Sequence, residues 1–185
     1  MIVTIVGDVG AGKSYTAVKY AVEHHAKGYY IYANFNMIGL KRFKKVSLSD
    51  ILDNPLDHEH PESAIFWTKY FKHPSIFIID EAVGWLDSRA SMSKNNRCVT
   101  RFVSQIRKIF GANEDGWLII VSQLSRMLDV RTRLLTHYWI IMEKIRKDPP
   151  LFLLKRTRNG RLIESKTYEF DPVIGNSYDS HEIVL

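Results

Sequence analysis

The sequence has little cysteine and no long apolar segment. Its 185 residues include one cysteine, Cys98, which excludes a disulfide framework and a cysteine zinc site and favours a reducing compartment. No apolar run approaches the roughly eighteen residues that a membrane-spanning helix needs. No basic leader precedes the first apolar run, as it would in a signal peptide. We therefore expect a cytoplasmic protein without a membrane partner.

Acidic residues are also scarce relative to basic ones. The chain carries 26 Lys and Arg against 20 Asp and Glu, a formal net charge of +6. The excess is segregated: residues 88–108 hold six basic residues and no acidic one, and residues 144–166 hold eight basic against two acidic. Basic segments without base-reading side chains suit binding to a phosphate backbone with little sequence preference. An ordinary solvated surface is the alternative interpretation.

Apolar runs alternate with helical patterns along the chain. The patterns predict strands over 2–6, 29–33, 75–79, 117–121 and 137–142, and helices over 13–27, 61–71, 94–110 and 129–135. We expect residues 34–49 to form a loop with a basic cluster at 41–45, and 50–62 to form a surface excursion. Asn159–Gly160 predicts a hairpin turn. The pattern indicates an α/β fold with a mostly parallel sheet between helical layers, extended by a C-terminal antiparallel hairpin. We expect one domain over 1–185, with its core in 1–145 and the hairpin and tail in 146–185.

The stretch GDVGAGKS, residues 7–14, has the spacing of a phosphate loop. Its glycines let backbone N–H groups turn toward an anion, and the following helix adds its positive end. Lys13 would reach the β- and γ-phosphates, and the Ser14 hydroxyl would bind Mg²⁺. A glycine-rich turn with a chance lysine is the alternative, which the strand before and the helix after disfavour. The predicted ATP-binding residues are Gly7, Asp8, Val9, Gly10, Ala11, Gly12, Lys13, Ser14 and Tyr15.

Two carboxylates follow the predicted strand 75–79. Asp80 would lie at the carboxyl edge of the sheet, where α/β proteins bind ligands, and would hold Mg²⁺ as a Walker B aspartate does. Glu81 could polarise the attacking water, as in ATPases that hydrolyse their nucleotide. A carboxylate pair that merely ends a strand is the alternative.

A third polar strand end is Ser122–Gln123. Gln123 could sense the γ-phosphate, or it could cap a neighbouring loop. The chain has no Asn-Lys-x-Asp motif, which disfavours a GTPase. A nucleotide or nucleoside kinase remains a candidate, although the Asp-Glu pair is less typical of one.

The order of several motifs resembles one superfamily. GDVGAGKS, YANFN, FIIDEAVGWLDSR, QIRKIFGANEDGWLIIVSQ and LDVRTR occur in this succession, which is similar to the FtsK–HerA ATPases. The nearest groups are zonular-occludens-toxin-like phage proteins and the packaging ATPases of archaeal viruses. The resemblance covers about residues 1–145. It implies a three-layer, RecA-like phosphate-loop fold of the ASCE type.

The same resemblance implies an ATP- and Mg²⁺-dependent homo-oligomeric ring, usually a hexamer, that threads double-stranded DNA. Such rings complete each site with an arginine from the next subunit. The candidates are Arg89, Arg107, Arg131 and Arg133, with Arg107 and Arg131 preferred; a solvated arginine is the alternative for each.

We therefore expect a viral genome-packaging ATPase in the host cytoplasm, with virion or portal proteins as candidate partners. Two alternatives stay open. One is a factor for virion morphogenesis or extrusion, and the other is the kinase.

Overall fold

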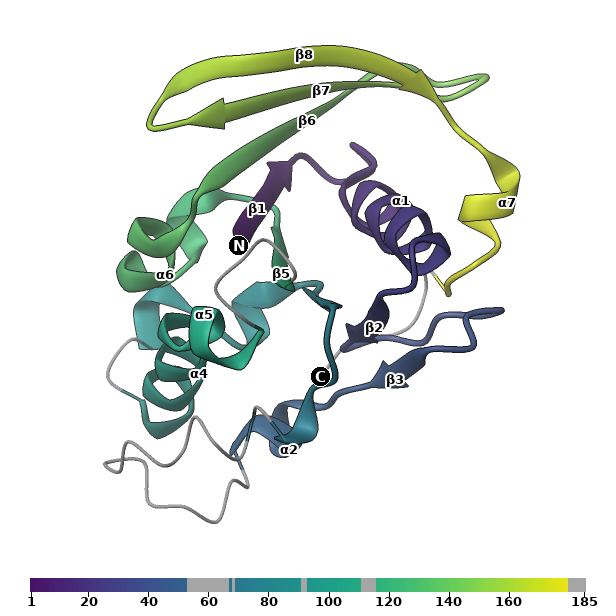
Figure 1. Cartoon of the computed structure of the whole chain (residues 1–185). Coiled ribbons are helices and arrows are strands. Elements are labelled where there is room, and N and C mark those ends of the chain that lie inside the picture. The colour runs from purple at the N-terminus through teal and green to yellow at the C-terminus, as the bar shows by residue number, and fades with distance from the viewer. Residues whose placement is uncertain (53–66, 68, 91–92, 111–115, 180–185) are drawn as a thin grey trace.

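The computed structural model describes residues 1–52, 67, 69–90, 93–110 and 116–179. Within them, one sheet has the strand order β3-β2-β4-β5-β1-β6-β7-β8. The strands from β3 to β6 pair in parallel, and β7 and β8 continue the sheet in antiparallel (Figure 1). The strands are β1 (Ile2–Gly7), β2 (Tyr30–Ala33), β3 (Phe43–Lys45), β4 (Ser75–Ile79), β5 (Gly116–Ser122), β6 (Tyr138–Arg146), β7 (Leu151–Arg158) and β8 (Arg161–Glu169).

Helices cover both faces of the sheet, which confirms the three-layer α/β prediction (Figure 1). Alternate residues of the central strands point to opposite faces: Ile76 and Ile78 pack with α1, whereas Phe77 and Ile79 pack with α4 and α5. The helices are α1 (Lys13–Ala26), α2 (Leu48–Leu52), α4 (Lys94–Ser104), α5 (Ile106–Ile109), α6 (Val130–Leu135) and α7 (Pro172–Gly175), with 3-10 turns η1 (Ala82–Gly84), η2 (Ser88–Ala90) and η3 (Ser125–Met127).

The C-terminal hairpin forms as the sequence predicts. Asn159 and Gly160 both have positive φ, 51° and 76°, as a two-residue turn that matches the twist of antiparallel strands requires. No helix among the described residues is long and apolar enough to cross a membrane.

Three elements differ from the prediction. Residues 48–52 form the short helix α2 rather than loop and surface excursion, because the buried Ile51 side chain packs in the hydrophobic core. Residues 43–45 form the edge strand β3 rather than a loop, because Ile31 N–H donates to the Arg42 carbonyl at 2.7 Å and Val46 N–H to the Ala33 carbonyl at 2.8 Å. The helix predicted over 94–110 is divided at Gln105, whose φ and ψ of −90° and 0° end α4. Residues 53–62 of the predicted surface excursion, and most of the helix predicted over 61–71, lie outside the described residues.

Candidate nucleotide site

The glycine-rich loop, residues 7–14, connects β1 to α1. Asp8, Val9 and Gly10 are exposed, and Ala11 N–H donates to the Asp8 carbonyl at 3.1 Å. Gly12 ends the loop with a φ of 84°, and a Cβ there would lie 2.7 Å from the Phe152 ring. Glycine is therefore needed at position 12 both for its backbone conformation and for its contact with β7.

Lys13 follows Gly12 as the first residue of α1, and it is 9% exposed. Its Nζ donates to the Asp8 carbonyl at 2.9 Å. Burial lowers the pKa of the Lys13 ammonium, and the negative charges of Asp80, Glu81 and Asp8 oppose that shift. The ammonium therefore faces the carboxylates that follow β4.

Asp80 directly follows β4 and is held by several donors. Burial raises the pKa of its carboxyl, against a hydrogen bond from the Ser14 side chain, the Glu81 N–H and the charge of Lys13. The Glu81 N–H lies 2.9 Å from Asp80 Oδ1. A carboxylate and a hydroxyl in contact are the hard oxygen ligands that Mg²⁺ prefers. Among the described residues, no three His, Cys, Asp or Glu side chains gather as a metal site, so phosphate oxygens and water would complete this one.

Asn34 fixes the position of Asp80, a role that the sequence motifs do not indicate. Its Oδ1 accepts from the Asp80 N–H and its Nδ2 donates to the Asp80 carbonyl, both at 2.8 Å. Asn34 is 4% exposed. The one signal in the sequence is a polar side chain directly after β2, at the same edge of the sheet as Asp80.

Glu81 is exposed beside this cluster and has a left-handed backbone, with φ 49° and ψ 43°. That conformation is uncommon outside glycine and costs about 1–2 kcal/mol. Such strain is typical of functional sites, and here it turns the chain at the strand end.

Gln123 follows β5, which lies between β1 and β4 in the sheet. Its carbonyl accepts from the Gly7 N–H at 3.3 Å, so it borders the start of the glycine-rich loop. The structure thus brings Lys13, Ser14, Asp80 and Glu81 together, with Gln123 at the same edge.

The candidate arginines lie on other elements. Arg131 is exposed on α6 and Arg133 is half-buried. Arg89 is exposed and pairs with Asp87 at 3.1 Å. Arg107 lies on α5, and its side chain is outside the described part of the chain.

A buried carboxylate within the LDVRTR motif anchors α6. Asp129, 1% exposed, accepts from the Arg131 N–H at 2.8 Å and from Asn96 Nδ2 of α4 at 3.3 Å. Its own N–H donates to the Leu86 carbonyl at 2.9 Å. The helix that carries Arg131 is therefore tied to the segment that follows Glu81.

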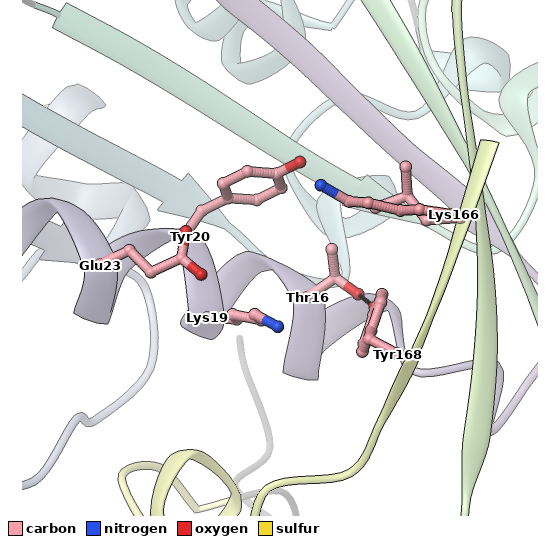
Figure 2. Close-up of a pocket in the computed structure, with 7 residues that line it drawn as sticks. Thr16, Lys19, Tyr20, Glu23, Lys166 and Tyr168 are labelled. Atoms are coloured by element: carbon pink, nitrogen blue, oxygen red, sulfur yellow. Dashed lines mark hydrogen bonds between the residues drawn. The ribbon is translucent and has the colours of Figure 1, made fainter. Parts of the chain in front are cut away.

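The C-terminal hairpin packs directly against the start of α1. The Tyr15 ring is buried and stacks with Phe152 and Tyr168, at 5.7 and 6.0 Å between centroids. Figure 2 shows Thr16 bonded to Tyr168 and Lys19 beside it. The cavity here measures about 30 Å³, room for roughly two waters rather than a nucleotide. The Tyr15 side chain thus supports the loop from behind.

The segment after α7 reaches the same neighbourhood. Tyr178 pairs with Met37 in an isolated bridge, and Ile38 N–H donates to the Ser177 carbonyl at 2.7 Å. Burial raises the pKa of Tyr178 to about 12, and the charge of Asp80 adds to the shift. This segment therefore lies beside the loop after β2, which also contains Asn34, the residue that hydrogen-bonds Asp80.

Solved structures share this fold at low sequence identity. The N-terminal domain of zonular occludens toxin from Neisseria meningitidis matches with a TM-score of 0.62 and 17% identity, over 96% of this chain and 98% of that one. The genome packaging NTPase B204 from Sulfolobus turreted icosahedral virus 2 matches with a TM-score of 0.51 and 15% identity, over 90% and 96%. The pCW3 conjugation coupling protein TcpA matches with a TM-score of 0.59 and 14% identity, over 93% of this chain and 61% of that one.

No curated protein matches the chain by sequence. The family model of zonular occludens toxin (Zot) matches residues 1–145, which are the residues that carry the motif succession. The predicted resemblance to zonular-occludens-toxin-like proteins is confirmed, and the chain belongs to the zonular occludens toxin (Zot) family.

Proposed function

We propose that the chain is an ATP-hydrolysing motor that moves double-stranded DNA for a virus. The observation that carries the proposal is the meeting of Lys13, Ser14, Asp80 and Glu81 at one edge of the sheet. Membership of the Zot family and the fold shared with a packaging NTPase support it.

Each residue has a role in this proposal. The N–H groups of the glycine-rich loop and the Lys13 ammonium bind the β- and γ-phosphates. Ser14 and Asp80 hold Mg²⁺, which supplies positive charge toward the phosphate oxygens. Glu81 orients a water for attack on the γ-phosphorus and takes its proton, while the bond between the γ-phosphorus and the bridging oxygen breaks and ADP leaves. Gln123 contacts the γ-phosphate and responds to its loss.

The motor would act as a ring, usually of six subunits, in which Arg131 or Arg107 of a neighbouring subunit stabilises the charge on the γ-phosphate. Packaging of a genome is the first candidate task, because the B204 neighbour is named a genome packaging NTPase. Virion morphogenesis or extrusion is the second, because the family model and the Neisseria domain are of the Zot type.

The test is an ATPase assay with and without long duplex DNA, together with a mass measurement in the presence of nucleotide. We expect ATP hydrolysis that duplex DNA stimulates, an oligomeric mass, and loss of hydrolysis in Lys13→Ala. Hydrolysis that Lys13→Ala leaves intact would contradict the site. Phosphoryl transfer to a nucleotide or nucleoside acceptor, without DNA stimulation, would assign the kinase function instead.

A further inference from the structure

A second cavity lies at the opposite edge of the sheet from the nucleotide site. It has a volume of about 290 Å³ and is formed by the starts of β2 and β3 and by the residues that precede β4. Because these strands are parallel, their starts all lie at the amino edge, whereas Asp80 and Gln123 lie at the carboxyl edge. Its polar lining residues are Lys41, Arg42, Lys44 and Lys72 and the three tyrosines Tyr30, Tyr32 and Tyr70.

Aromatic rings hold three of the four cations. Lys44 Nζ lies 3.7 Å from the centre of the Tyr70 ring. Lys72 Nζ and Arg42 Cζ lie 5.4 and 6.0 Å from the centre of the Tyr30 ring. The Lys72 N–H also donates to the Tyr32 hydroxyl at 2.9 Å. The rings attract and orient these side chains. An anion that binds them therefore loses less affinity to the conformational entropy of ordering the cations.

Within the described part of the chain, these cations form no ion pair with a carboxylate, whereas some basic residues of the C-terminal strands do. Among the ion pairs between described residues, none includes the four cations of the cavity. On the C-terminal strands, by contrast, glutamates pair with the basic residues, as in Lys155–Glu143 at 2.8 Å and Lys166–Glu164 at 3.0 Å. Asp50 is the carboxylate that faces Lys44; it hydrogen-bonds Ser47 and Tyr70. Among the described residues, one carboxylate faces the four cations, so the described lining of the cavity is positively charged.

We propose that this cavity binds the phosphodiester backbone of DNA. The proposal rests on the DNA-moving part of the proposed function and names the surface that holds the DNA. Phosphate oxygens can bind several cations at once and carry no base sequence, which matches a site whose described residues include four cations and one opposed carboxylate. The two sites are at opposite edges of the sheet, so DNA and nucleotide can be bound together.

The test measures binding of a labelled short duplex by fluorescence anisotropy as salt is varied. The double variant Lys44→Ala/Lys72→Ala removes two cavity cations. Lys108→Ala/Lys147→Ala removes two exposed lysines from the other basic segments and serves as the matched control. We expect at least a tenfold loss of affinity in the cavity variant, and a slope of log K against log salt that is smaller by about two. The control variant should show a much smaller loss of affinity and a much smaller change in the slope.

Other arms of the experiment separate the remaining outcomes. Lys44→Arg/Lys72→Arg keeps the charges and should retain binding, and circular dichroism with a thermal melt verifies that each variant is folded. A single strand of the same length shows whether the paired form is required; preference for either form supports the proposal, since both carry the phosphodiester backbone.

Equal or greater loss in the control variant would assign the DNA to the other segments and overturn the proposal. Stabilisation by inorganic phosphate but not by DNA, if Lys13→Ala keeps it and the cavity variant loses it, would also overturn the proposal, because the cavity would then be a site for free phosphate. ATP hydrolysis measured without DNA tests the nucleotide site by itself. If the cavity does not bind DNA but hydrolysis without DNA is intact, this proposal fails while the proposed ATPase site stands.

Discussion

At the scale of single residues, the candidate nucleotide site contains two side chains, Lys13 and Asp80, whose burial disfavours their charged forms. Burial lowers the pKa of Lys13 and raises that of Asp80, so each charge is costly when considered alone. Their mutual attraction and the Ser14 hydrogen bond offset part of the cost. A site that holds unfavourable charges in place before the nucleotide binds gives up stability for function.

Asp80→Asn tests this balance. Because the folded-state pKa of Asp80 is raised, its charged form destabilises the native state above that pKa. The destabilisation shrinks as pH falls below the folded-state pKa and is absent below about 3.9, the pKa of a free aspartate, where the carboxyl is neutral in both states. We expect the variant to be more stable than wild type at neutral pH, with a difference that shrinks in acid, while Mg²⁺-dependent hydrolysis is lost. Urea unfolding at several pH values measures the difference in stability between the variant and wild type. A variant less stable than wild type at neutral pH would show that the Lys13 charge and the Ser14 hydrogen bond stabilise the Asp80 carboxylate by more than burial destabilises it.

Glu81→Gln separates binding from chemistry. The amide keeps the size of the side chain and the left-handed backbone but cannot take a proton. We expect ATP affinity to remain and the rate of hydrolysis to fall about 10²- to 10⁴-fold, the usual contribution of a general base. Nucleotide titration and single-turnover kinetics measure the two quantities. Normal turnover would remove Glu81 from the role of base, while lost affinity would show that it positions the nucleotide.

At the scale of elements, the sequence predicts most of the sheet because its central strands are continuous apolar runs. Ser75–Ile79 is buried throughout, as its composition indicates, and Asn159–Gly160 specifies its own turn. The strand Phe43–Lys45 carries no such signal, because its conformation comes from pairing with β2.

The site shows the same division between local and distant causes. The spacing of Gly7, Gly12, Lys13 and Ser14 is local, so the loop could be predicted. Asn34 bonds a residue 46 positions away, and Asp129 bonds Asn96, 33 positions away. Asn34 is marked only as a polar residue directly after an apolar strand, and Asp129 lies within the LDVRTR motif. Neither feature identifies the bonding partner, so only the folded chain reveals which polar residue holds which element.

The contact between β7 and the glycine-rich loop gives a prediction for the hairpin. Phe152 is 4% exposed and backs Gly12, so Phe152→Ala should lower the free energy of unfolding by about 3–5 kcal/mol and raise KM for ATP. Leu153→Ala is the control, because the neighbouring side chain points to the other face of the strand and is only half-buried. Urea unfolding and ATP titration provide the two readouts. If KM is unchanged while stability falls, the hairpin supports the fold but not the loop.

At the scale of the whole molecule, Asp129 connects the segment after Glu81 to the helix that carries Arg131. The bonds to Leu86, Asn96 and Arg131 join three segments through one buried carboxylate. In a ring, this connection would link the site of one subunit to the arginine that it offers to the next.

Mixed rings test whether Arg131 acts across the subunit interface. Arg131→Ala and Glu81→Gln should each abolish hydrolysis, since an arginine supplied in trans contributes about 10³- to 10⁵-fold. In an equal mixture, an Arg131→Ala subunit can contribute its intact Glu81 while its Glu81→Gln neighbour contributes the arginine. Random assembly makes about one interface in four complete, so activity should recover to about a quarter of wild type when one arginine serves each site. Arg126→Ala, which removes an exposed arginine from η3, should be active alone. Mixtures that stay inactive would exclude Arg131 as the shared residue and turn the search to Arg107.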